Sequence, residues 1–175
     1  MRGITLDRIV YFVLAVIVTG AVQAHAETIS GKPTIVDGDT IEIGSEKIRL
    51  HGIDTPEPAQ PYGKDATNAL ARLAEGKEVR CAGWERDAFE RLIAICHAGQ
   101  INLNEEMMIE GMAWAFVKYS HDYFGLEMAA REDHRGIWKD KPERPWEFRA
   151  KRWEAAAQDA PKGCPIKGNI NEDGT

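Results

Sequence analysis

Two short segments of alternating hydrophobicity are the feature that most constrains how this chain can fold. Thr40–Ile43 and Ile48–Leu50 place an isoleucine or a leucine at every second position. This period is the pattern of a strand with one buried face. Gly44-Ser45 lies between them and is typical of a tight hairpin turn. We therefore expect a β-hairpin whose buried face is formed by Ile41, Ile43, Ile48 and Leu50.

The rest of the chain predicts further short strands and helices. A second hairpin is expected over Glu78–Ala82 and Arg91–His97. Helices, each followed by a glycine suited to a helix C-terminus, are expected over Gly63–Glu75, Asn104–Glu110 and Tyr123–Arg135. This order favours a small closed β-barrel with packed helices, in the α+β class. A five-stranded OB-fold barrel with about three helices fits it, although the pattern alone does not single out that barrel.

The first 26 residues carry the pattern of an export signal. Basic residues precede an apolar run over Ile9–Val22, which is short for a membrane span. Ala24-His25-Ala26 then supplies the small–x–small pattern of a cleavage site. We predict a signal peptide over residues 1–26, with cleavage after Ala26, and a periplasmic or secreted protein. An uncleaved N-terminal anchor is the alternative.

Export would carry the cysteines into an oxidising compartment, where they can pair. The chain has three of them, Cys81, Cys96 and Cys164. Cys81 and Cys96 lie on the two segments of the second hairpin, so we predict a disulfide between them, which would contribute about 3 kcal/mol. Free buried thiols in a core hairpin are the alternative. Cys164 has no predicted partner.

One domain accounts for most of the chain. We place it at residues 27–140, a length sufficient for a hydrophobic core. Residues 141–175 are expected to form a C-terminal extension. Pro145 can open a helix over Trp146–Gln158, and Ala160–Thr175, rich in Gly, Pro, Asn and Asp, is expected to be irregular.

The overall charge is acidic, because 28 Asp and Glu residues outnumber 22 Lys and Arg residues and give a net charge of −6. A surface of this kind does not attract nucleic acid by its overall field. If the chain binds DNA or RNA, a local site must hold the phosphates.

Asp39 and Asp54 are expected at the ends of neighbouring strands. Their carboxylates, together with a loop carbonyl such as that of Thr55, suit Ca²⁺, which accepts irregular cages of oxygen ligands. The sequence has no Cys/His cluster at zinc spacing. Each segment alone has a plainer explanation, since Asp37–Thr40 can be an ordinary turn and Arg49–Glu57 a surface ion-pair cluster.

Arginines beside such a cation suit a phosphate substrate, because guanidinium groups bind phosphate oxygens bidentately. Arg49 and Arg91 are the candidates, and Glu57, just after the expected metal loop, can deprotonate a water. Arg49 and Asp54 would face opposite sides of a regular strand. Their convergence requires the strand to end or bulge, and Gly52 is the expected place.

Five segments in combination resemble the staphylococcal nuclease (thermonuclease) family, in its order and spacing over Thr28–Trp138. They are Val36-Asp37-Gly38-Asp39-Thr40, Arg49–Glu57, Gln60-Pro61-Tyr62-Gly63, Asp87–Arg91 and Gly136-Ile137-Trp138. Each segment is common, but the combination is specific. The resemblance implies an OB-fold barrel, endonuclease activity on DNA and RNA, and, for this chain, an exported bacterial member of the family.

The resemblance also implies a Ca²⁺ site. Its ligands would be Asp39, Asp54 and the backbone carbonyl of Thr55, with the carboxylate of Asp37 close to the metal. No stable protein partner is implied, so we expect a monomer.

Further residues gain roles by the same resemblance. Arg49 and Arg91 match the arginines that bind the phosphate, and Glu57 matches the proposed general base. Tyr119 matches a tyrosine of the nucleotide pocket, and an aromatic at the barrel edge is the alternative for it.

The segment Asp87–Arg91 departs from the family pattern Asp-x-Tyr-Gly-Arg. Glu90 replaces the glycine, so a backbone conformation that needs glycine must change or be strained. Its carboxylate could also compete with phosphate for Arg91. These differences and the net acidity favour a second interpretation, a catalytically weak or silent OB-fold module that binds nucleic acid or protein in the cell envelope.

Overall fold

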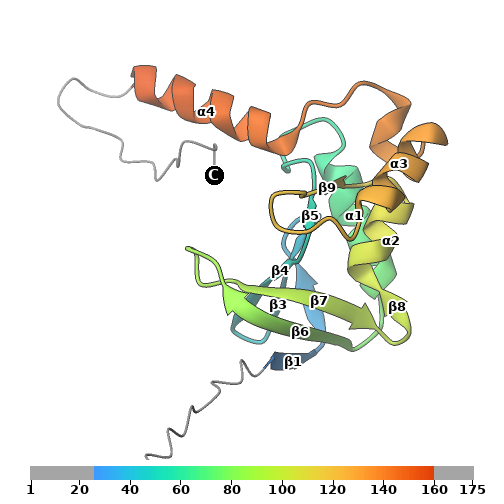
Figure 1. Cartoon of the computed structure of the whole chain (residues 1–175). Coiled ribbons are helices and arrows are strands. Elements are labelled where there is room, and N and C mark those ends of the chain that lie inside the picture. Colours follow the sequence, from blue (N-terminus) through green and yellow to red (C-terminus); the bar gives the residue numbers. More distant parts are fainter. Residues whose placement is uncertain (1–25, 160–175) are drawn as a thin grey trace, which may run out of the picture.

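The computed structural model describes residues 26–159 (Figure 1). Apart from Ala26, the predicted signal peptide lies outside the described residues, as do Cys164 and the tail from residue 160. Those expectations stay predictions. Among the residues described, no helix has the length and apolar character needed to cross a bilayer.

The main sheet has seven strands in the described part of the chain. Six of them follow the order β1-β6-β7-β4-β3-β2, and β8 pairs with β7. Their bounds are Glu27–Gly31 (β1), Pro33–Ile35 (β2), Thr40–Ile43 (β3), Glu46–Leu50 (β4), Val79–Arg86 (β6), Leu92–Ala98 (β7) and Ile101–Asn102 (β8). A separate pair is formed by β5 (Ile53–Asp54) and β9 (Trp114–Ala115).

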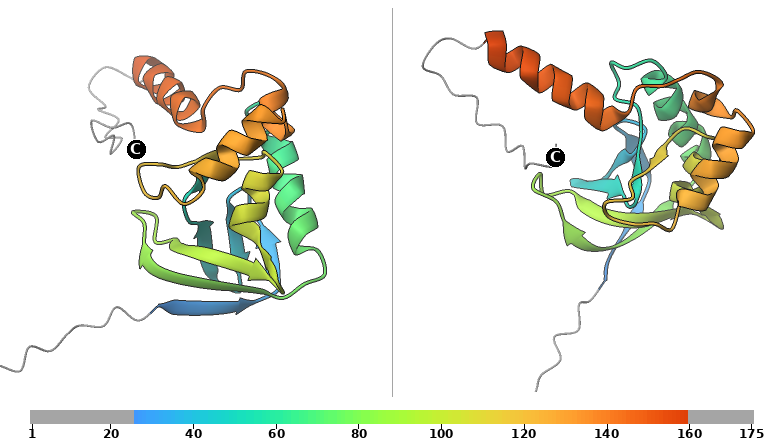
Figure 2. Two further views of the ribbon diagram at one scale, coloured as in Figure 1. Left: turned by 45° about the vertical axis from the view of Figure 1, so that its right-hand side comes forward. Right: turned by 45° about the horizontal axis from the view of Figure 1, so that its top comes forward.

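The main sheet curls round on itself, as Figures 1 and 2 show. β1 and β2 are separated only by Lys32, yet they lie at opposite ends of the strand order. β1 pairs with β6 and β2 pairs with β3, so one bent strand serves both ends of the sheet. The fold is therefore the predicted OB-type barrel. The strand count exceeds five because this bent strand is divided at Lys32 and the short β8 is added.

Four α-helices accompany the sheet within residues 26–159. They are α1 (Gly63–Ala74), α2 (Leu103–Ile109), α3 (Phe124–Glu132) and α4 (Pro145–Asp159), and a 3₁₀ helix spans Gly136–Lys139. The predicted helices are confirmed to within one turn. The first three lie together beside the barrel, whereas α4 extends away from it (Figures 1 and 2).

The β3–β4 hairpin forms as its alternation predicts. Ile41 lies opposite Ile48 in the ladder. The four predicted core residues of this hairpin are all buried, and each such burial stabilises the fold by roughly 1.5–3 kcal/mol. No alternation of buried and exposed apolar residues predicts β1, because its residues are mostly exposed. Pairing with β6 keeps that segment extended.

The second hairpin carries the disulfide. Cys81 and Cys96 lie directly opposite each other in the β6–β7 ladder. Both are fully buried, and their sulfurs are bonded. The bond therefore links two strands at a position where the ladder already pairs them.

One buried side chain ties α2 to the barrel. Asn104 is 0% exposed, and its Oδ1 accepts the N–H of Cys96 at 3.0 Å. Its Nδ2 donates to the carbonyls of His51 and Ala94 at 2.9 and 3.3 Å. This amide thus joins the start of α2 to β7 and to His51, the residue that follows β4 at the turn into β5.

Asn104→Ala should lower the free energy of unfolding by about 2–4 kcal/mol, because it leaves buried backbone groups without partners. Urea unfolding measures this change. Asn68→Ala, at an exposed position of α1, is the matched control and should stay within about 0.5 kcal/mol of the wild type. An equally small effect of Asn104→Ala would contradict the role given to this amide.

Candidate active site

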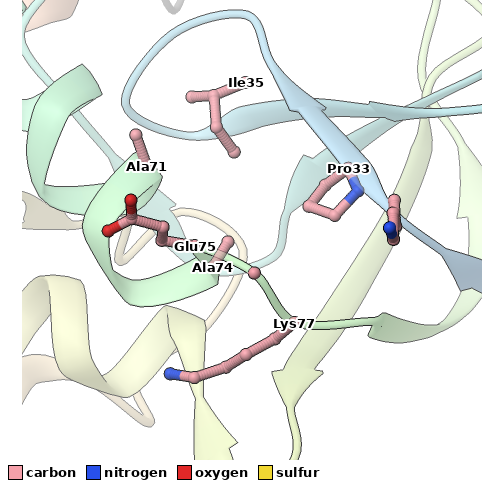
Figure 3. Close-up of a pocket in the computed structure, with 8 residues that line it drawn as sticks. Pro33, Ile35, Ala71, Ala74, Glu75 and Lys77 are labelled. Carbon is pink, nitrogen blue, oxygen red and sulfur yellow. The ribbon is translucent and has the colours of Figure 1, made fainter.

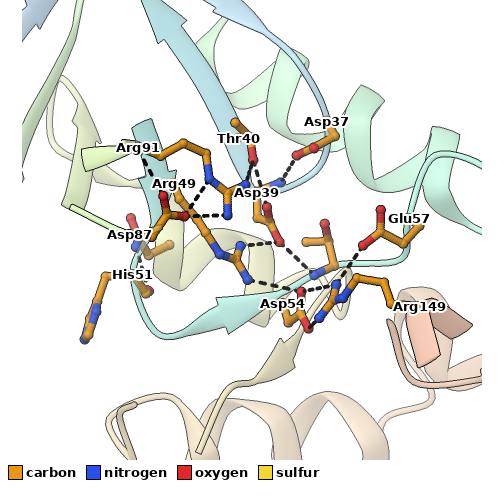
Figure 4. A network of polar contacts seen from close by, with 12 residues as sticks. Asp37, Asp39, Thr40, Arg49, His51, Asp54, Glu57, Asp87, Arg91 and Arg149 are labelled. Atoms are coloured by element: carbon orange, nitrogen blue, oxygen red, sulfur yellow. Dashed lines mark hydrogen bonds and ion pairs between the residues drawn. The ribbon is translucent and has the colours of Figure 1, made fainter. Parts of the chain in front are cut away.

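Arg49 bridges two buried aspartates at the centre of the polar network in Figure 4. Asp39 precedes β3, Arg49 lies on β4, and Asp54 ends β5. Nη1 of Arg49 lies 2.7 Å from Oδ2 of Asp39, and Nη2 lies 3.2 Å from Oδ1 of Asp54. The two aspartates are only 6% and 1% exposed. The structure therefore brings together the two acids and the arginine that the sequence places at neighbouring strand ends.

The chain turns sharply between β4 and β5. Gly52 has a φ of 74°, in the left-handed region that residues with a Cβ rarely adopt. A Cβ at this position would also lie 2.8 Å from the ring of Tyr123. The turn interrupts the strand alternation, so Arg49 and Asp54 face the same site. The predicted break at Gly52 is confirmed.

The loop before β3 is held close to the loop after β5. Asp37 accepts the N–H of Asp39 at 3.0 Å. Asp39 accepts the hydroxyl of Thr40 at 3.0 Å and the N–H of Thr55 at 3.1 Å. A Cβ on Gly38 would lie 2.6 Å from Oγ1 of Thr55. The Asp-Gly-Asp sequence therefore provides a close approach between the two loops as well as a turn.

Burial and neighbouring charges act on the pKa values of the three aspartates. Burial, together with the charge of Asp39, raises the pKa of Asp37 to about 6. Burial alone would raise the pKa of Asp39, but the Arg49 guanidinium and hydrogen bonds lower it below the usual value. Burial raises the pKa of Asp54, and hydrogen bonds from Arg149 act in the opposite direction. Asp39 is thus kept ionised, which is the state that a cation ligand needs.

Arg91 reaches the edge of this network from the loop before β7. Its Nε and Nη2 lie 2.7 and 2.6 Å from Oδ2 of Asp87, and its Nη1 lies 3.5 Å from the hydroxyl of Thr40. The carboxylate paired with Arg91 is that of Asp87, and the side chain of Glu90 is exposed. The expected competition between Glu90 and phosphate for Arg91 stays a prediction.

Glu57 lies in the loop between β5 and α1. Its N–H donates to Oε1 of Gln60 at 2.7 Å, and Nε2 of Gln60 donates to the carbonyl of Glu143 at 3.2 Å. The carboxylate of Glu57 lies 2.7 Å from Nη1 of Arg149. The predicted base is thus connected through its side chain to α4, and through its backbone and Gln60 to the segment just before α4.

Arg149, on α4, completes the network and was not predicted from the sequence. Its Nη2 lies 2.7 Å from Oδ2 of Asp54 and its Nη1 lies 3.2 Å from Oδ1 (Figure 4). The same Nη1 contacts Glu57. Pro145 signals the start of the helix that carries Arg149. No local pattern indicates which residue, 95 positions earlier in the chain, the arginine will reach.

The oxygen donors of this site fit a hard divalent cation. Asp39 and Asp54 contact the same guanidinium, so both carboxylates can share one positive group. Between residues 26 and 159, no three Asp, Glu, His or Cys side chains form a ready metal cage. Water would have to complete the ligand shell, which Ca²⁺ tolerates.

Tyr119, the candidate pocket residue, lies between β9 and α3 and is 53% exposed. Its ring centroid lies 4.8 Å from that of Phe116, and Lys118 lies over its face. A role for Tyr119 in binding a nucleotide stays a prediction.

A separate hollow of about 190 Å³ lies between β2 and the end of α1 (Figure 3). Its lining is mainly apolar and small, and its charged residues are Lys32, Glu75 and Lys77. No residue of the Arg49 network lines it, so this hollow is not a candidate active site.

Sequence comparisons place the chain in a family. The family described as staphylococcal nuclease homologue matches residues 47–140. An uncharacterized endonuclease of Escherichia coli O157:H7 is 35% identical over 126 residues, which cover 67% of this chain and 82% of that relative. An uncharacterized endonuclease of Haemophilus influenzae is 37% identical over 113 residues, 61% of this chain and 64% of that relative. This chain belongs to the staphylococcal nuclease family.

The plant relatives are longer proteins. The probable staphylococcal-like nuclease CAN4 of Oryza sativa subsp. japonica is 33% identical over 137 residues, 77% of this chain. The chain spans only 28% of that relative and 33–35% of the other rice relatives it matches.

Replacement of Glu90 tests the strain in the loop that carries Arg91. Glu90 has a φ of 62°, where a side chain with a Cβ costs about 1 kcal/mol relative to glycine. Glu90→Gly should therefore raise the free energy of unfolding by about 0.5–1 kcal/mol. Thermal unfolding measures this gain. Glu90→Ala is the control, and an equal gain for alanine would attribute the effect to the lost charge instead of the backbone.

Proposed function

We propose that this chain is a Ca²⁺-dependent endonuclease that hydrolyses phosphodiester bonds of DNA, RNA or both. The observation that carries the proposal is the contact of Arg49 with both Asp39 and Asp54, with Arg91 and Glu57 at the edges of the same network. Family membership supports it, because relatives in bacteria and rice bear the names endonuclease and nuclease.

The aspartates are the proposed metal ligands. Asp39 and Asp54, with the carbonyl of Thr55, would hold Ca²⁺, and Asp37 keeps the Asp39 backbone in place through its hydrogen bond. When bound, Ca²⁺ would supply positive charge beside the phosphate and lower the pKa of a neighbouring water.

Arg49 and Arg91 are the proposed phosphate ligands. A guanidinium has five N–H donors, so Arg49 can bind a phosphate oxygen while it stays bonded to both aspartates. Arg91 is directed to the same region by Asp87 and lies near Thr40. Both charges stabilise most where negative charge accumulates, in the five-coordinate state of phosphorus.

Glu57 is the proposed general base. Gln60 fixes its backbone in the loop that follows Asp54. The carboxylate takes a proton from a water as the water oxygen attacks phosphorus in line. The bond from phosphorus to the leaving oxygen breaks, and that oxygen takes a proton from solvent.

A second candidate function is a catalytically weak or silent OB-fold module that binds nucleic acid or protein. The contacts of Arg149 favour it, because an internal cation already pairs with Asp54 and Glu57. The net charge of −6 also provides no general attraction for the polyanion that a nuclease must hold.

We also propose that the protein is exported, with a signal peptide over residues 1–26. The bond between Cys81 and Cys96 supports this proposal, since disulfides persist mainly in oxidising compartments. N-terminal sequencing of the exported protein should give Glu27 as the first residue. A chain that begins at Met1 would contradict cleavage.

Glu57→Gln and Arg49→Lys should each reduce cleavage of DNA by about 100-fold or more, through loss of the base and of the guanidinium fork respectively. An activity gel with Ca²⁺, and then with a chelator, measures this. Glu75→Gln, at an exposed position after α1, is the control and should cleave like the wild type.

Three outcomes of this assay would count against the proposal. Full activity of either site variant would remove its residue from the mechanism. Cleavage that persists in the presence of a chelator would refute the proposed dependence on a metal ion. Absence of cleavage by the wild type with any divalent ion would favour the binding module.

A further inference from the structure

The guanidinium of Arg149 is placed across the two acids that the proposed function assigns to the metal and to the base. Both carboxylate oxygens of Asp54 accept N–H groups from it, at 2.7 and 3.2 Å. Oε1 of Glu57 accepts from it at 2.7 Å. Asp54 is 1% exposed, so it has almost no contact with solvent that could replace this partner.

These contacts leave little room on Asp54 for another cation. Oδ1 also accepts an N–H from Arg49 at 3.2 Å, so both oxygens are engaged and two positive side chains already surround the carboxylate. A divalent ion on Asp54 would have to displace an N–H and would meet repulsion from both guanidinium groups.

Of the two arginines, Arg149 is the one that can withdraw. Arg49 lies on a central strand of the barrel, and its side chain is 14% exposed, whereas that of Arg149 is 31% exposed. The helix that carries Arg149 is anchored at its start, where Trp146 stacks on Phe116 with ring centroids 6.0 Å apart. Residues 151–158 are exposed, and α4 extends away from the barrel in every view (Figures 1 and 2).

We propose that Arg149 is an internal cation that occupies the place of the divalent ion on Asp54 in the metal-free protein and leaves Asp54 when the metal binds. This inference rests on the proposed function, because it takes Asp54 as a metal ligand. Binding of the metal and docking of Arg149 are then mutually exclusive. By linkage, a change at Arg149 that weakens its contact with Asp54 strengthens metal binding, by up to the free energy of that contact.

A positioning role for Arg149 predicts the opposite change in Ca²⁺ affinity when the arginine is removed. If the guanidinium orients Asp54 and Glu57 to receive the metal, its loss weakens metal binding. The Ca²⁺ affinity of an Arg149 variant therefore distinguishes competition from positioning without any measurement of activity.

The test is calorimetric titration of the whole chain with Ca²⁺. Arg149→Ala should bind Ca²⁺ about tenfold more tightly than the wild type, or tighter still, because one competing charge is removed. Arg149→Gln, which keeps hydrogen-bonding capacity without the charge, should gain affinity in the same direction and serves if the alanine variant does not fold. Arg152→Ala, on the same helix and with its guanidinium 5.9 Å from the ring of Phe148, is the matched control and should bind like the wild type.

Hydrogen exchange of the wild type gives a second readout. Addition of Ca²⁺ should speed exchange of the α4 amides around Arg149, because the contact that docks this turn is lost. Slower exchange there, or equal or weaker Ca²⁺ binding by both Arg149 variants, would overturn the proposal and leave the proposed nuclease function standing. If neither the wild type nor the variants bind Ca²⁺, the metal assignment itself fails and this inference fails with it.

Discussion

The contact of Arg49 with Asp39 and Asp54 is the interaction on which the rest of the site depends. Two carboxylates that are 6% and 1% exposed have lost most of their hydration and repel each other, at a cost of several kcal/mol for each ion. Arg49 offsets both effects, with its two Nη atoms 2.7 and 3.2 Å from the acids. Because the acids adjoin β3 and β5 while Arg49 lies on β4, the same contact also fixes the corner where these strands meet.

Such a buried cluster of charges is better explained by the binding of charged ligands than by a contribution to folding stability. Apolar residues of similar size usually stabilise a core as well as a buried ion pair does, whereas carboxylates suit a cation and a guanidinium suits a phosphate. The structure adds Arg149 to this cluster, from outside residues 27–140 that we assigned to the domain and outside the family match at 47–140. The C-terminal helix is therefore part of the electrostatics of the site.

Local patterns predicted the parts of the fold that local physics determines. Alternation around Gly44-Ser45 predicted the β3–β4 hairpin and its buried face, and the need for Arg49 and Asp54 to converge predicted the break at Gly52.

Strand β1 was not predicted, because its extended conformation depends on pairing with β6 and not on a pattern in its own residues. The role of Arg149 was not predicted for a similar reason. Its contact with Asp54 depends on how α4 packs and not on residues close to it in the sequence. The replacement of glycine by Glu90 predicted a strained backbone, and Glu90 has a positive φ. Only the structure showed that Asp87 is the acid that pairs with Arg91.

A crystal structure of the whole chain with Ca²⁺ and a nucleotide bearing a terminal phosphate would test the central claim most directly. We expect the ion on the carboxylates of Asp39 and Asp54, the phosphate against Arg49, and Arg149 no longer on both oxygens of Asp54. An ion bound at other residues, with Asp39 and Asp54 still held only by arginines, would contradict the assignment of this site.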